Sequence, residues 1–174
     1  NMNVNEVIAN RAIEILGGNK GDYSIIHPND HVNMAQSTND VIPSAAKMTV
    51  IDLMKPLVSN MENLVDAFLE KSKEFDHIIK MGRTQMQDAV PIRLGQEFAS
   101  YASCIKRDIE RIKQVEKEMH EINMGGTAIG TSINVDSLYL EKIDKEISAV
   151  CGYGVHLAND LIDATQSLDG IVNV

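Results

Sequence analysis

Two clusters of small polar side chains stand directly ahead of long helical patterns in this sequence. The first is Ser37-Thr38-Asn39-Asp40, and the second is Gly82-Arg83-Thr84-Gln85. Hydroxyl and amide groups donate hydrogen bonds without ionising, and the free N–H groups at a helix N-terminus attract anions. These residue types in these positions therefore predict binding of a small dicarboxylate anion.

Structural roles are the alternative explanation for both clusters. Ser, Thr, Asn and Asp are the preferred N-cap residues, and capping and anion binding can coexist at one helix end. Asp40 suits capping or orienting a neighbour better than contacting substrate, because an anion repels a dianion. Arg83 could neutralise a substrate charge or form a structural ion pair. Thr84 and Gln85 could simply satisfy backbone groups in a loop.

A long helix is predicted between the two clusters. Apolar residues recur at steps of four and three from Val50 to Phe68, which indicates a helix from about Ala35 or Pro43 to Glu74. Pro43 and Pro56 each remove one backbone hydrogen bond, so we expect a kink or a break at one of them.

Three more helices complete the predicted fold, which is an all-α, elongated bundle of long helices. One covers residues 7–16 and ends at Gly17-Gly18. Pro91 at a first turn and an apolar spacing of about 3.5 residues predict another helix over residues 91–122. A last helix is capped by Asp136 and runs to Val150.

Composition limits the class of partner. The net charge of -9 and the pI of about 4.9 argue against nucleic acid, whose phosphates reward clustered Lys and Arg. An anionic substrate must therefore be held by local donors. No stretch of about 18 apolar residues could span a bilayer, so we expect no membrane partner and a soluble, cytoplasmic protein. Cys104 and Cys151 have no nearby metal-ligand spacing and are expected to be buried or partly buried reduced thiols.

At its polar junctions the sequence resembles the fumarase/aspartase superfamily of lyases. Four segments carry the resemblance in the family's order, at residues 1–12, 27–40, 82–98 and 125–134. They read NMNVNEVIANRA, HPNDHVNMAQSTND, GRTQMQDAVPIRLGQEF and GGTAIGTSIN. The resemblance implies a truncated central helical-bundle domain over residues 34–174, preceded by the tail of an N-terminal domain over residues 1–33. It also implies a homotetramer with a shared helical core, whose sites draw segments from three subunits.

Within the superfamily, the chain is more similar to the aspartases than to the fumarases. Fumarases typically have His where this chain has Gln85, and Gln cannot exchange a proton near neutral pH. Residues 163–166 and 86–91 also resemble the aspartase versions of those segments. The implied activity is reversible elimination of ammonia from L-aspartate to give fumarate through an aci-carboxylate intermediate. Hydration of fumarate to malate is the alternative, and a catalytically inactive structural or interaction bundle is the alternative of another class.

The resemblance also implies roles for single residues. Ser37 and Thr38 would donate to the β-carboxylate, and Asn39 would hold the departing amino group. Thr84 would contact the α-carboxylate, with Gln85 beside the amine or carboxylate. Removing the proton beside the β-carboxylate places a second negative charge on that group, so donors that strengthen as the charge develops accelerate the reaction.

A secondary anion site and the cofactor needs follow from the same resemblance. His27, Asn29 and Asp30 match a dicarboxylate-binding loop of fumarases, and an ordinary turn is the alternative. No cofactor is required, and activation by a divalent metal such as Mg²⁺ is left open. The remaining histidines lack metal-ligand spacing, so no metal site is predicted.

The proton-abstracting residue of the superfamily has no counterpart in this chain. It is a serine on a flexible loop with a pattern like GSSxMPxKxN, and residues 1–174 contain no such segment. We therefore expect the chain to be a central fragment with no catalytic residue of its own. The purified 174-residue chain is predicted to release no fumarate from L-aspartate, as followed by fumarate absorbance. Measurable fumarate production would refute this expectation.

Overall fold

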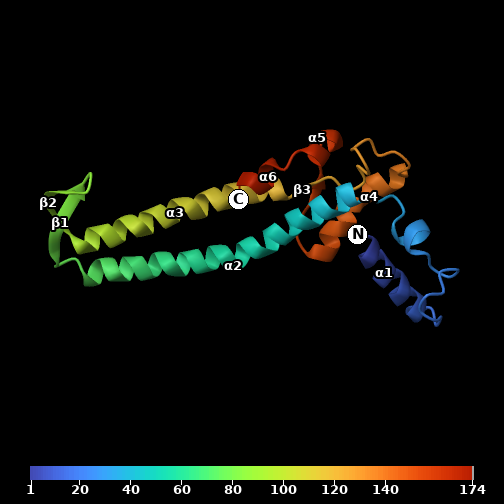
Figure 1. The fold of residues 1–174 in the computed structure, drawn as a ribbon, viewed down its shortest axis with the longest axis horizontal. Coiled ribbons are helices and arrows are strands. Elements are labelled where there is room, and N and C mark those ends of the chain that lie inside the picture. The colour runs from blue at the N-terminus through green and yellow to red at the C-terminus, as the bar shows by residue number, and fades with distance from the viewer. Residues whose placement is uncertain (174) are drawn as a thin grey trace. The chain divides into compact units, whose positions relative to one another are not determined.

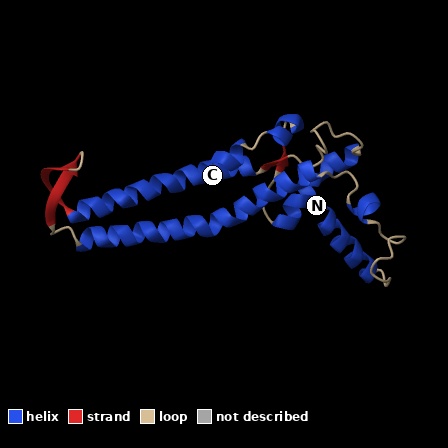
Figure 2. Ribbon diagram, viewed as in Figure 1, coloured by secondary structure: helices blue, strands red, loops and turns tan. Residues whose placement is uncertain are grey.

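The computed structural model describes residues 1–173, and α-helices dominate it (Figure 1). About 62% of the chain is helical, which confirms the predicted helical class. Two small two-stranded sheets were not predicted (Figure 2). The chain divides into two compact units: residues 1–49 with 119–173, and residues 50–118. The predicted division between residues 33 and 34 stays a prediction.

The first unit contains most of the elements. In chain order they are α1 (Met2–Ile15), the π-helical turn η1 (Pro28–Val32), the start of α2 (Thr38–Glu74), β3 (Glu121–Ile122), α4 (Ser137–Cys151), β4 (His156–Leu157), α5 (Leu161–Gln166) and α6 (Asp169–Asn173). β3 and β4 pair in parallel, and the buried side chains of Ile122, Met124 and Val155 form a core beside them.

The helix α2 is continuous through both prolines, so the predicted break is absent. A proline at position 43 leaves the carbonyl oxygen of Asn39 without its usual helical donor. The side-chain Nδ2 of Asn123 supplies the missing bond and donates to that oxygen at 3.0 Å. A side chain thus replaces the backbone hydrogen bond that Pro43 removes.

In the second unit, α2 and α3 (Leu94–Met119) run side by side in opposite directions (Figure 1). Val65, Ala102 and Ile109 are buried between the two helices, where partly buried apolar residues extend the contact. Those residues are Val58, Met61, Phe68, Leu69 and Ile105. Of the apolar residues that recur from Val50 to Phe68, Met61 and Phe68 pack against this core, whereas Leu57 and Leu64 are exposed. Cys104 on α3 is also exposed, which corrects the prediction that it is buried or partly buried.

A β-hairpin joins the two helices, and this corrects the predicted start of the second one. β1 (Ile79–Thr84) pairs antiparallel with β2 (Gln87–Arg93), and Pro91 lies in β2 opposite Met81 instead of opening a helix. A two-stranded ribbon tolerates this proline because each strand has an open edge. Gln85 and Met86 form the turn with φ of 51° and 61°, which matches the twist of a hairpin.

The predicted end of the same helix is also wrong, whereas the predicted N-cap of α4 is confirmed. α3 ends at Met119, because Ile122 is fully buried and pairs with β4 instead of continuing the helical stripe. Asp136 caps α4 by accepting a hydrogen bond from the N–H of Leu138 at 2.7 Å. Gly152 ends it in the left-handed conformation at φ 79°. Within residues 1–173, no helix combines the length and the apolar character that crossing a membrane requires.

Two glycines of the first unit give a matched test of packing. Gly130 has φ +87°, and a Cβ at this position would collide with backbone atoms of Leu161 and Ile162. Gly154 has open space around its Cβ position. We expect Gly130→Ala to lower the free energy of unfolding by about 3 kcal/mol, because it combines overpacking with left-handed strain. Gly154→Ala should change it by less than about 0.5 kcal/mol. Equal midpoints of urea unfolding for the two variants would contradict the packing of residue 130.

Candidate functional site

Reciprocal capping fixes the start of α2. The Oγ of Ser37 accepts a hydrogen bond from the N–H of Asn39 at 3.2 Å. In return, the Oδ1 of Asp40 accepts one from the N–H of Ser37 at 2.8 Å. A Ser at the N-cap with an acidic residue three positions later is a capping box, which satisfies N–H groups that the helix leaves free. The capping explanation from the sequence therefore applies to Ser37 and Asp40.

The other oxygen of Asp40 binds a distant turn. Its Oδ2 accepts hydrogen bonds from the N–H groups of Gly125 at 3.2 Å and Thr127 at 3.0 Å. The side chain is fully buried, and a buried carboxylate is costly unless it is hydrogen-bonded. Three backbone donors meet that requirement, so Asp40 joins the helix start to residues 125–127 and does not line the pocket described below.

A second ionisable group lies near this carboxylate. Burial raises the pKa of the Tyr139 phenol, and the negative charge of Asp40 raises it further. The folded protein therefore keeps the phenol neutral. Because the folded pKa is raised, its contribution to stability is present below the ordinary pKa near 10 and is lost as pH rises through the folded value.

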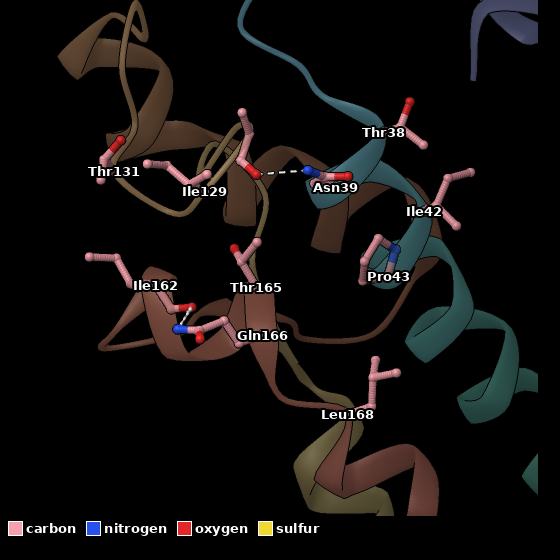
Figure 3. Close-up of a pocket in the computed structure, with 11 residues that line it drawn as sticks. Thr38, Asn39, Ile42, Pro43, Ile129, Thr131, Ile162, Thr165, Gln166 and Leu168 are labelled. Carbon is pink, nitrogen blue, oxygen red and sulfur yellow. Dashed lines mark hydrogen bonds between the residues drawn. The ribbon is translucent and has the colours of Figure 1, made fainter.

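Two hydrogen bonds fix Asn39 in place. Its side-chain Nδ2 donates to the carbonyl oxygen of Ala128 at 2.7 Å, a bond drawn in Figure 3. Its backbone carbonyl accepts from Asn123 at 3.0 Å. Because the amide nitrogen is engaged, the acceptor end of the side chain, Oδ1, is left for other partners.

Thr38 and Asn39 line an open pocket of about 810 Å³ in the first unit (Figure 3). Three segments form its walls: the start of α2, the turn after residue 127, and α5 with the residues that follow it. The polar lining residues are Thr38, Asn39, Thr131, Thr165 and Gln166, and the others are Ile42, Pro43, Ala128, Ile129, Ile162 and Leu168. None of these side chains is charged, so the pocket offers neutral donors and acceptors beside an apolar wall.

The two predicted clusters lie in different compact units of the chain. Ser37, Thr38 and Asn39 lie together at the start of α2 in the first unit. Thr84 ends β1 and Gln85 lies in the hairpin turn, both exposed and both in the second unit. The roles predicted for Thr84 and Gln85 stay predictions. Arg83 donates from its Nε to Asp88 at 3.1 Å within the same hairpin, which is the structural ion pair offered as an alternative.

The predicted secondary anion loop forms a turn that its own residues hold. The Nδ1 of His27 accepts hydrogen bonds from the N–H groups of Asn29 and Asp30, both at 3.2 Å. The carboxylate of Asp30 lies 3.4 Å from the same nitrogen. The two accepted hydrogen bonds account for the turn, and anion binding by the loop stays a prediction. Across the described residues, no group of three or more His, Cys, Asp or Glu side chains is arranged to hold a metal ion.

Sequence reasoning missed several residues of the site. Asn123 was not singled out, although it is a polar residue directly after an apolar stripe and is only 2% exposed. Thr165 and Gln166 were noted for their resemblance and not as pocket residues, because α5 meets the start of α2 only in the folded chain. Residues 125–134 carry part of the family resemblance, and Ala128, Ile129 and Thr131 from this segment line the pocket.

The fold and the pocket define the class of the fumarase-like helical lyases. The crystal structure of fumarate lyase:delta crystallin from Brucella melitensis bound to cobalt superposes with a TM-score of 0.92 at 45% identity. The match covers 98% of this chain and 37% of that chain. A family model described as Lyase matches residues 1–174, so the chain belongs to this lyase family.

Among curated relatives, aspartate ammonia-lyase of Bacillus subtilis (strain 168) is 50% identical over 174 residues, all of this chain. Fumarate hydratase class II of Rhizobium meliloti (strain 1021) is 44% identical over 173 residues, or 99% of this chain. The chain spans 37% of the length of each of these two relatives.

Replacing Asp40 by Asn tests the buried carboxylate. The amide keeps the shape of the side chain, but its NH₂ group would face an N–H donor that the carboxylate now satisfies. We expect Asp40→Asn to lower the free energy of unfolding by about 3 kcal/mol. Asp52→Asn is the control, because Asp52 is exposed on the same helix and pairs with Lys55 at 3.4 Å. Its cost should stay below about 1 kcal/mol. Similar urea midpoints for both variants would show that the three buried bonds add little.

Proposed function

We propose that this chain provides a dicarboxylate-binding part of an aspartate ammonia-lyase, which converts L-aspartate to fumarate and ammonia. The observation that carries the proposal is the pocket at the start of α2, where Thr38 and Asn39 face a space lined only by neutral side chains. Membership in the lyase family supports it, as does the higher identity to the aspartate ammonia-lyase than to the fumarate hydratase.

Local electrostatics suit a dicarboxylate in spite of the net charge of -9. The positive end of the α2 dipole lies at Thr38, and a helix start favours a negative group within its first turn. Asp40 is the acidic residue of that turn, and its carboxylate accepts hydrogen bonds from three backbone N–H groups. An anion in the pocket therefore meets neutral donors, while the carboxylate of Asp40 is buried outside the pocket and accepts from its own three backbone donors.

The hydroxyl groups at the helix start suit the charge that develops in the reaction. Ser37 uses its oxygen to accept from Asn39, which leaves its own proton free to be donated. Thr38 is exposed at the pocket and presents a second hydroxyl. When the proton beside the β-carboxylate leaves, two negative charges gather on that group, and the Thr38 hydroxyl in the pocket can strengthen its bond to it. Ser37 does not line the pocket, and its hydroxyl holds the backbone of Asn39 beside Thr38.

Asn39 suits the amino group of aspartate. The carbonyl of Ala128 holds its Nδ2, so Oδ1 is the end that remains for a ligand. An ammonium group has donors only, and an amide oxygen accepts from it. The orientation of this amide therefore favours a ligand carrying a protonated amine.

We propose that Thr84 and Gln85 reach the site from another subunit of a homotetramer, with Thr84 on the α-carboxylate. Gln85 has no proton to exchange near neutral pH, so it can orient a substrate and cannot act as its base. Loss of ammonia then needs a base from elsewhere in the full-length protein. No cofactor is assigned to the reaction.

The test uses the full-length protein that contains this chain, assayed with L-aspartate and with L-malate by fumarate absorbance. We expect a higher kcat/KM for aspartate. We expect Thr38→Val, which keeps the size of the side chain and removes the hydroxyl, to lower kcat for aspartate about a hundredfold to a thousandfold.

Thr49→Val is the matched control, because Thr49 bonds to Ala45 within α2 and does not line the pocket. This variant should leave the kinetics unchanged. A preference for malate would replace the proposal with fumarate hydratase. Absence of turnover with either substrate would favour an inactive structural bundle.

A further inference from the structure

We infer that Asn123 is a positioning residue that sets the amine-binding end of the pocket by holding the backbone of Asn39. The inference rests on the proposed function, because it concerns how that site recognises an amine. Asn123 does not line the pocket and would act only through the residues that do.

The side chain of Asn123 makes three hydrogen bonds to other elements of the first unit. Its Nδ2 donates to the backbone oxygen of Asn39 at 3.0 Å and to the Oγ1 of Thr165 at 3.1 Å. Its Oδ1 accepts from the Oγ of Ser44 at 3.1 Å. The residue is 2% exposed, so these bonds are shielded from water and hold a defined geometry.

Pro43 explains why the bond to Asn39 is available. In a regular helix the N–H of residue 43 would donate to the oxygen of residue 39, and proline has no N–H. Asn123 takes the place of that donor. The first turn of α2 is thus held from outside the helix, by a residue 84 positions away.

The same amide group links two walls of the pocket. One hydrogen of Nδ2 holds Asn39 on α2 and the other holds Thr165 on α5, and both residues line the pocket (Figure 3). Ala128, on the third wall, binds the Asn39 side chain. With its backbone and its amide nitrogen both held, the Oδ1 of Asn39 is fixed as an acceptor for an ammonium group.

The experiment measures the reverse reaction in the full-length protein, addition of ammonia to fumarate. Asn123→Leu keeps a similar volume and removes both donated bonds. We expect KM for ammonium to rise about tenfold, because a small displacement of a binding group weakens its contact with the ligand. KM for fumarate should stay unchanged, since the N–H of Ser37 remains bonded to the buried Asp40 carboxylate, which the variant leaves in place.

Ser44→Ala is the control for a purely structural role. It removes the third bond of Asn123 from an equally buried position, so it should lower the thermal midpoint and leave KM for ammonium unchanged. A rise in KM for ammonium with this variant, or an equal rise in both KM values with Asn123→Leu, would overturn the inference.

A second substitution distinguishes loss of the bond to the Asn39 backbone from general destabilisation of the protein. Pro43→Ala introduces an N–H that can donate to the oxygen of Asn39, so adding it to Asn123→Leu should return KM for ammonium toward the value of Pro43→Ala alone. No recovery would overturn the inference.

If Asn123→Leu does not fold, Thr165→Val tests the same amide from α5, with Thr165→Ser as the variant that keeps the hydroxyl. A larger KM for ammonium in Thr165→Val than in Thr165→Ser is expected, and equal values would overturn the inference. An unmodified protein that adds no ammonia to fumarate would instead refute the proposed function itself.

Discussion

The buried carboxylate of Asp40 is the constraint on which the rest of the candidate site depends. A negative charge away from water is unfavourable unless donors surround it, and here the donors are backbone N–H groups of Ser37, Gly125 and Thr127. Two of these groups lie more than eighty positions along the chain. Satisfying one side chain therefore forces the start of α2 and the segment after β3 into one arrangement.

The segment after β3 adopts unusual backbone conformations in order to supply those donors. Gly125 has φ 81° and Thr127 has φ 60°, and two later residues, Ser132 and Asn134, are also left-handed. Left-handed conformations cost non-glycine residues about 1 kcal/mol or more each, so they persist where the surrounding contacts fix them. The bonds to Asp40 and the bond from Asn39 to Ala128 are such contacts. Strain in this segment and the shape of the pocket wall thus have the same origin.

Local patterns predicted much of the fold because they act over a few residues. The caps at Ser37 and Asp136 depend only on neighbours, and the structure contains both. The hairpin was missed because the stretch around Pro91 was read as a first helical turn. Its strands depend on pairing between residues 79–84 and 87–93, which no single segment specifies. The contacts of Asn123 could not be predicted, since they join residues 42 to 84 positions apart.

The pocket is formed by segments that lie far apart in the sequence, and this determines when it can form during folding. Residues 50–118 form their core between two helices joined by a short hairpin, so their contacts close early as the chain is made. The bond between Asn39 and Ala128 must wait for a further stretch of chain, because 89 positions separate the two residues. Closing such a long loop lowers the chain entropy before any contact can offset that loss. The end of the pocket at Asn39 therefore forms late in folding, after the pair of helices in residues 50–118 has packed.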